Sequence, residues 1–204
     1  MQFNCGSVTP GVLKSLIPHV RLNIRTLTLG LSYSLTNDDI FSFLGELPNL
    51  KWLQLHYYWV CLLPAPNYFL NLMMLCRLQQ MKRPNNLPKL LALHSFTVSY
   101  KQVYSKKDAN ELDKWIRCVI ARSSRLQELS IVGDQQESDQ YDFGAAVAHD
   151  AIVDHIVKKH AERIRVLCFR SAFVSVKALR ALLGTCTNLE VCRFRVGKEA
   201  LVST

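Results

Sequence analysis

Residues 47–55 read LPNLKWLQL, and residues 87–95 read LPKLLALHS. Both stretches space leucines alike after a Leu-Pro pair, which indicates an internal repeat. The shared frame Leu-x-x-Leu-x-Leu occurs six times, as IRTLTL at 24–29, LKWLQL at 50–55, LLALHS at 90–95, LQELSI at 126–131, IRVLCF at 164–169 and LEVCRF at 189–194. Positions four and six point to the same side of an extended strand, so the frame predicts six short strands with one apolar face each. Ser95 breaks the pattern in the third copy and leaves the register around Phe96 open.

Between these strands the apolar residues recur at helical spacing. Helices are predicted at 11–19, 36–47, 105–122, 148–161 and 176–185, and Thr36, Ser105 and Ser175 are expected as N-caps. A unit of one strand and one helix cannot bury both apolar faces alone, whereas stacked units can. We therefore predict an α/β solenoid with about six parallel strands on its concave side and helices on its convex side. A doubly wound sheet is disfavoured because no glycine-rich turn follows any strand.

The stretches LPNLKWLQL, HVRLNIRTLTL and CTNLEVCRF resemble leucine-rich repeats of the long, ribonuclease-inhibitor-like kind, and look most like those of fungal F-box proteins. The resemblance covers about residues 11–201. It implies that residues 1–204 are a single leucine-rich-repeat domain, part of a longer array, with an irregular insertion at about 56–87. In that family an N-terminal F-box docks the adaptor of a cullin-type ubiquitin ligase. This sequence has no Leu-Pro-x-Glu-Leu-Leu-type stretch, so the adaptor is expected as a partner only if an F-box is missing from it.

Composition indicates a globular intracellular protein, because 49% of its 204 residues are apolar and 20% are charged. Seven cysteines include no Cys-x-x-Cys pair, which favours reduced thiols in the cytoplasm or nucleus. The N-terminus does not resemble a secretory signal. Residues 57–76 carry no charge, but Pro64, Pro66 and Asn67 interrupt them, so no membrane span is predicted.

The sequence offers little for catalysis. The stretch 149–160, HDAIVDHIVKKH, contains His149-Asp150 and Asp154-His155, but the spacing is not His-Glu-x-x-His and no phosphate-binding glycine loop occurs elsewhere. The cysteines lie among apolar residues without a neighbouring base to activate them. We predict that the protein is not an enzyme and needs neither a metal ion nor a cofactor.

The candidate binding residues come from the strand frame. Its third and fifth positions, and the one after the sixth, face the concave side. These positions predict an aromatic and polar patch of Trp52, Gln54, His56, His94 and Phe96, and an arginine patch of Arg170, Arg193 and Arg195. Aromatic residues and arginines are the usual anchors of protein interfaces. Because the net charge is +9, we expect an acidic protein partner.

These observations predict a protein-interaction module that binds through its concave sheet. The resemblance implies the substrate-recognition part of an F-box-type ubiquitin ligase receptor. Two alternatives stay open: a basic, nucleic-acid-binding repeat protein, and a truncated repeat fragment without independent function. Nucleic acid is the less favoured partner, because the strand faces lack the interleaved aromatics and lysines of a single-strand platform.

Overall fold

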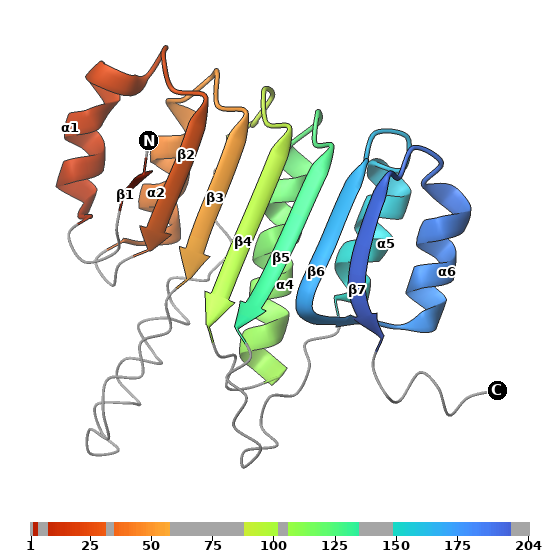
Figure 1. Ribbon diagram of the computed structural model, residues 1–204. Helices are drawn as coiled ribbons and strands as arrows, with labels where there is room; N and C mark the ends of the chain where they lie inside the picture. Colours follow the sequence, from red (N-terminus) through yellow and green to blue (C-terminus); the bar gives the residue numbers. More distant parts are fainter. Residues whose placement is uncertain are drawn as a thin grey trace, which may run out of the picture.

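The computed structural model describes residues 2–3, 8–31, 35–57, 88–101, 106–134 and 149–196. These residues form one parallel sheet in which strands follow one another in chain order, with the helices on one face (Figure 1). The strands are β1 (Gln2–Phe3), β2 (Thr26–Leu31), β3 (Trp52–Tyr57), β4 (Ser95–Lys101), β5 (Glu128–Asp134), β6 (Val166–Val174) and β7 (Val191–Val196). The helices are α1 (Pro10–Val20), α2 (Asn37–Gly45), α4 (Lys106–Arg122), α5 (Asp150–Lys159) and α6 (Val176–Thr185).

The order of the strands confirms the predicted leucine-rich-repeat solenoid. Each of β2 to β6 pairs in parallel with the strand before it and the strand after it, so the sheet has no point at which the order reverses. A doubly wound sheet would have such a point. Two features differ from expectation. Gln2 and Phe3 add a short seventh strand against Thr28 and Leu29, and the expected insertion at 56–87 overlaps the end of β3. The rest of that segment, 58–87, lies outside the described residues.

The helices begin where their capping residues predict. Thr36 caps α2 with a complete capping box, since its hydroxyl accepts from the Asp39 amide at 3.2 Å and the Asp39 carboxylate accepts from the Thr36 amide at 3.0 Å. Ser175 caps α6 by accepting from the Ala178 amide at 3.1 Å. The expected cap Ser105 lies outside the described residues. Side-chain caps of this kind each contribute about 1 kcal/mol to helix stability.

The register of β4 corrects the sequence frame. Phe96 pairs with Leu53 on one side and Leu129 on the other, so it occupies position four, which the sequence pattern had assigned to Leu93. The frame of this repeat is therefore 93–98, LHSFTV, three residues later than predicted. Phe96 is fully buried, as is Val98 at position six. The expected place of Phe96 on the concave face is wrong, because that place belongs to Ser99.

Two ladders of apolar side chains form the core between the sheet and the helices. Position four is occupied by Leu27, Leu53, Phe96, Leu129 and Leu167, and position six by Leu29, Leu55, Val98, Ile131 and Phe169. The ring of Trp115 on α4 lies 6.0 Å from Phe96 and 5.7 Å from Phe41 on α2. Large aromatic rings bridge successive repeats here, which makes Phe96 central to the stacking of the array.

Replacing Phe96 by alanine tests this register. We expect Phe96→Ala to lower the free energy of unfolding by about 3–5 kcal/mol, because it leaves a cavity beneath Trp115. His94→Ala, two residues earlier, serves as the control and should cost under about 1 kcal/mol. Urea denaturation measures both values. Similar losses for the two variants would contradict the register of β4.

Candidate functional site

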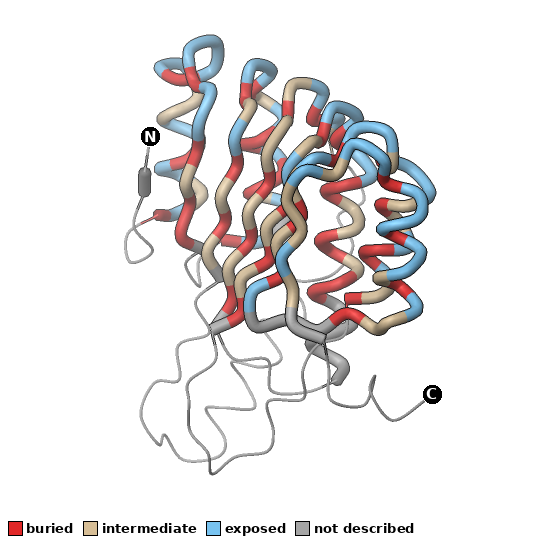
Figure 2. The backbone as a smooth tube through the Cα atoms, turned by 45° about the vertical axis from the view of Figure 1, so that its right-hand side comes forward, coloured by how far each residue is buried: buried red, intermediate tan, exposed pale blue. Residues whose placement is uncertain are grey.

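The face of the sheet opposite the helices presents side chains from positions three, five and seven of each repeat; we call this set on β2–β7 the open face. Alternation along each strand turns these residues away from the helices, while positions four and six of β2–β6 are buried (Figure 2). Position three is Thr26, Trp52, Ser95, Glu128, Val166 and Val191, and position five is Thr28, Gln54, Thr97, Ser130, Cys168 and Arg193. The open face is therefore the surface that the sequence frame predicted, except that β4 contributes Ser95, Thr97 and Ser99 in its corrected register.

The predicted residues Trp52, Gln54 and His56 lie together on β3. They form a ridge of large side chains, since their ladder neighbours on β4 are Ser95, Thr97 and Ser99. Trp52 is 44% exposed, which is unusual for so large an apolar side chain. Burial lowers the pKa of His56, so this imidazole is neutral at neutral pH. The exposed indole of Trp52 lies beside a row of small hydroxyl side chains on β4. An extended partner chain can lie along this row and contact the indole.

His94 does not belong to the open face. The corrected register places it at position two, just before β4 begins, where its ring nitrogen Nδ1 contacts the carbonyl oxygen of Ala92 at 2.5 Å. It therefore lies at the edge where the strands start, and Thr97 takes the position predicted for it. The cause is that the sequence fits the frame in two ways. Leu90 and Leu93 match positions one and four, and so do Leu93 and Phe96 three residues later.

The predicted arginine patch is only partly assembled. Arg193 pairs with Cys168 and is exposed, and Arg170 pairs with Val132 on β5 and is exposed. A shift of register between Cys168 and Phe173 then places Arg195 beside Phe173 instead of Arg170. The expected row of Arg170 and Arg195 on adjacent strands is thus wrong. An irregularity of this kind adds residues to one strand and moves the partner out of step.

A row of polar residues at the edge was missed by the sequence frame. Position two of successive repeats is occupied by Arg25, Lys51, His94, Gln127, Arg165 and Glu190. The backbone carbonyl of each of the first five accepts two amide hydrogen bonds from the next repeat, at 2.8–3.1 Å. Five members of this row were visible in the sequence as the second position of a frame, whereas the frame at 90–95 had Leu91 there. Only strands stacked in register bring the members together.

The residues of the His149-Asp150 dipeptide considered for catalysis have different partners, since the Asp150 carboxylate accepts from the Ser175 amide at 2.8 Å and His149 contacts Asp113. His149 is fully buried, and its Nδ1 lies 2.6 Å from Oδ1 of Asp113 on α4. The Tyr100 hydroxyl lies 3.4 Å from His149 Nε2, and the imidazole stacks on Phe169 with ring centres 5.8 Å apart. Burial, and secondarily the charge of Asp113, raise the pKa of Tyr100 to about 12, so its hydroxyl keeps its proton at neutral pH. His149 has no exposed surface, and the network joins α4, the start of α5, β4 and β6 in the interior.

The cysteines of the last repeats are partly or fully buried, Cys168 and Cys192 partly and Cys186 fully. Burial, followed by the neighbouring Cys168 and Cys186, raises the pKa of Cys192 to about 11, and burial also raises that of Cys186. Thiols with raised pKa are poor nucleophiles. Among the described residues, no group of three or more His, Cys, Asp or Glu side chains could hold a metal ion, and no helix is long and apolar enough to cross a membrane.

Comparisons with known proteins add little beyond the fold. No protein family matches the sequence, and no curated protein is significantly similar to it. Among solved structures, the chain is similar to a tropomodulin C-terminal domain from Caenorhabditis elegans, with 7% sequence identity and a TM-score of 0.42. The alignment covers 89% of this chain and 93% of that one. A likeness this distant carries no functional argument, so the class of the protein, a leucine-rich-repeat solenoid, rests on its own sheet topology.

The buried Asp113–His149 pair should couple strongly. We expect His149→Ala to lower the free energy of unfolding by about 3 kcal/mol, because it leaves the Asp113 carboxylate buried without its partner. Asp113→Ala together with His149→Ala should cost less than the sum of the single changes by about 1 kcal/mol or more. A double-mutant cycle by denaturant unfolding measures this. Additive losses would show that the pair does not act as a unit.

His160 predicts a loss of stability in acid. Burial, with the nearby charges of His155 and Arg163, lowers its pKa to about 4, against the opposing effect of a backbone hydrogen bond at Ile120. In the unfolded chain the same imidazole has a pKa near 6.5, so between pH 6.5 and 4 the unfolded state binds a proton that the folded state does not. The contribution of neutral His160 to the free energy of unfolding is therefore complete above pH 6.5 and is lost as pH falls towards 4. It amounts to about 3 kcal/mol at most. Thermal unfolding at pH 7.0 and 5.0 should show a smaller drop in Tm for His160→Gln than for the wild type, and equal drops would contradict the assignment.

Proposed function

We propose that this chain is a protein-interaction module that binds a polypeptide partner on its open face. The observation that carries the proposal is the exposed indole of Trp52, which stands on β3 beside the small hydroxyl side chains of Ser95 and Thr97. A large apolar side chain costs free energy while it is in water, and binding a partner recovers that cost. Trp and Arg are also the residue types that most often dominate binding energy at interfaces.

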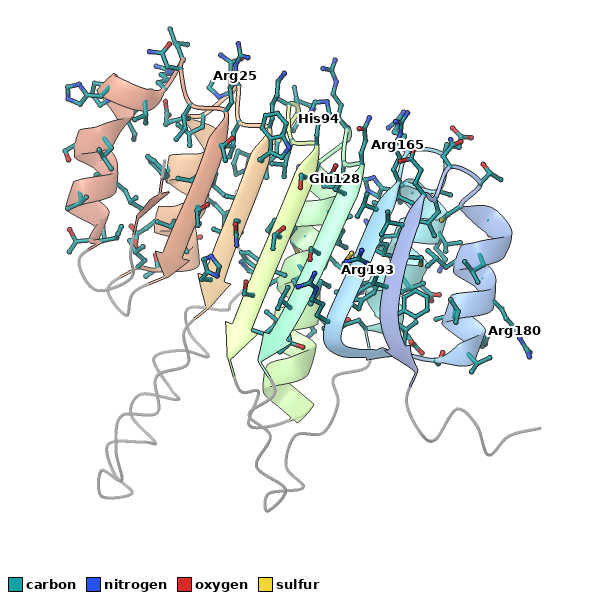
Figure 3. All side chains as sticks on the ribbon, in the orientation of Figure 1. Arg25, His94, Glu128, Arg165, Arg180 and Arg193 are labelled. Atoms are coloured by element: carbon teal, nitrogen blue, oxygen red, sulfur yellow. The ribbon has the colours of Figure 1, made fainter. Side chains whose placement is uncertain are left out.

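Positive charge at the β6–β7 end of the open face also supports this proposal. Arg193 and Arg170 are exposed, and the carboxylate of Glu128 on β5 lies between them and the β3 ridge along the sheet. Figure 3 shows Glu128 and Arg193 on the strands, on the side away from the helices. A partner that fits would place an apolar group at Trp52 and an acidic group at the arginines. The rigid ladder keeps the ordering cost of binding low on this side of the interface.

The finer proposal is that the chain serves as the substrate-recognition part of an F-box-type ubiquitin ligase receptor. Its support is the resemblance of the repeat frames to those of fungal F-box proteins. In that role the open face would select the protein to be ubiquitinated, and a separate F-box would contact the ligase adaptor. The protein partner is then a substrate that carries acidic residues. No catalytic residue and no cofactor is needed for selection of this kind.

Affinity purification from the native cells, followed by mass spectrometry, tests both levels. We expect Trp52→Ala, and separately the pair Arg170→Glu and Arg193→Glu, to reduce recovery of one set of partners at least tenfold, which corresponds to about 1.4 kcal/mol. The pair Lys177→Glu and Arg180→Glu is the matched control, since it makes the same change of charge at exposed positions of α6.

The outcomes separate the module from the ligase role. Partners lost from the open-face variants and kept by the control would support the interaction module, and ligase subunits in the same set would support the F-box reading. Identical partner lists for every variant, with circular dichroism showing that all are folded, would refute binding on the open face.

A further inference from the structure

The edge of the sheet at which the strands begin carries a concentration of cationic side chains. We define the basic rim as Arg25, Lys51, Arg122, Arg125, Arg163 and Arg165, which come from the loops that lead into β2, β3, β5 and β6 and from the end of α4. Figure 3 shows Arg25, His94 and Arg165 along this one edge, whereas Arg193 lies further down the strands and Arg180 projects from α6. The basic rim is thus separate from the arginines of the open face.

Internal pairing accounts for only part of this charge. Arg165 lies 3.6 Å from Glu190, and Arg163 donates a hydrogen bond to the carbonyl oxygen of Ser124 at 2.7 Å. Within the described part of the chain, the side chains of Arg25, Lys51, Arg122 and Arg125 have neither a hydrogen bond nor an ion pair. These four cations therefore remain available to a ligand.

Helix ends do not explain the rim either. Cations are favoured near the C-terminus of a helix, within its last turn, and Arg122 at the end of α4 fits that role. Arg25 follows the last residue of α1 by five positions, and Lys51 and Arg165 follow the ends of α2 and α5 by six. These position-two residues lie just before the strands, beyond the last turn of the preceding helix, so the helix dipole does not account for their charge.

The backbone holds this row in fixed positions. Because the carbonyls of the position-two residues from Arg25 to Arg165 each accept two amide hydrogen bonds from the next repeat, successive members are spaced as parallel strands are, about 4.8 Å apart. Four such steps from Arg25 to Arg165 span about 19 Å, which six residues of an extended peptide cover at about 3.4 Å each. Trp52 directly follows Lys51 and is exposed beside the row.

The chemistry of the rim favours a peptide over a nucleic acid. Glu128, Glu162 and Glu190 are exposed among or next to its cations. A phosphate backbone has a negative charge at every step and would meet these carboxylates, whereas a peptide can place a neutral or basic residue opposite each one. The neighbouring indole adds a contact for one apolar side chain. We propose that the basic rim, together with Trp52, binds an extended acidic segment of a partner protein.

This inference rests on and deepens the proposed function, since Trp52 of the open face also takes part here. The cations of the basic rim are, however, different residues from the arginines of the open face. Selection of binders from a displayed library of random twelve-residue peptides against the whole chain tests it. Peptides selected on the wild type should be enriched in Asp and Glu and should carry one large apolar residue. Their affinity, measured by fluorescence anisotropy at 150 mM NaCl, should fall at least tenfold on Arg25→Glu with Lys51→Glu, and less than twofold on the control pair Lys177→Glu with Arg180→Glu.

The remaining outcomes decide between the proposals. If peptide binding is lost in the variant Arg25→Glu with Lys51→Glu and kept in the variant Arg170→Glu with Arg193→Glu, that result supports peptide binding at the basic rim. It does so even if no native partner of the open face is found. Selected peptides without acidic enrichment, or equal weakening by the rim and control pairs, would overturn the rim. It would also be overturned if a twelve-nucleotide single-stranded DNA bound more tightly than the best peptide and displaced it.

Discussion

Everything else in this structure depends on burying one face of each strand. In the parallel ladder, side chains at positions four and six of neighbouring repeats stack directly on one another, and the helices close over them. Alternation has a period of two, so a slip of one residue would expose the whole apolar set. The requirement that one face be buried therefore decides which residues are available on the other face. The composition of the open face is a consequence of the core.

The same constraint explains why two candidate binding surfaces exist. The open face contains positions three, five and seven, which tolerate polar and aromatic residues because they do not pack against helices. The basic rim includes three position-two residues, Arg25, Lys51 and Arg165, which lie where the backbone ladder starts. Trp52 is adjacent to both surfaces, and a partner chain could contact them in one continuous path. Stacked repeats commonly bind extended partners, because their side chains recur at a regular spacing.

Buried polar groups add specificity to a mostly apolar core. The contacts of Asp113, His149 and Tyr100 join α4, the start of α5 and β4, with Phe169 of β6 beneath the imidazole. A slip of two residues would preserve the apolar alternation, whereas a hydrogen-bonded network is satisfied in one arrangement. The His149-Asp150 dipeptide considered for catalysis thus makes structural contacts, since His149 lies against Asp113 and the Asp150 carboxylate accepts from the Ser175 amide.

The sequence by itself determined the repeat architecture, the capped helices α2 and α6, and the ridge of Trp52, Gln54 and His56, because each follows from local periodicity and capping chemistry. It did not decide the frame in β4. A frame that starts at Leu90 has Leu93 at position four, and a frame that starts at Leu93 has Phe96 and Val98 at positions four and six. Only pairing with β3 and β5 selected Phe96 for the core and moved His94 to the edge. The offset of Arg195 from Arg170 and the assembly of the basic rim likewise required tertiary structure, since both depend on how separate strands align and no local pattern encodes that alignment.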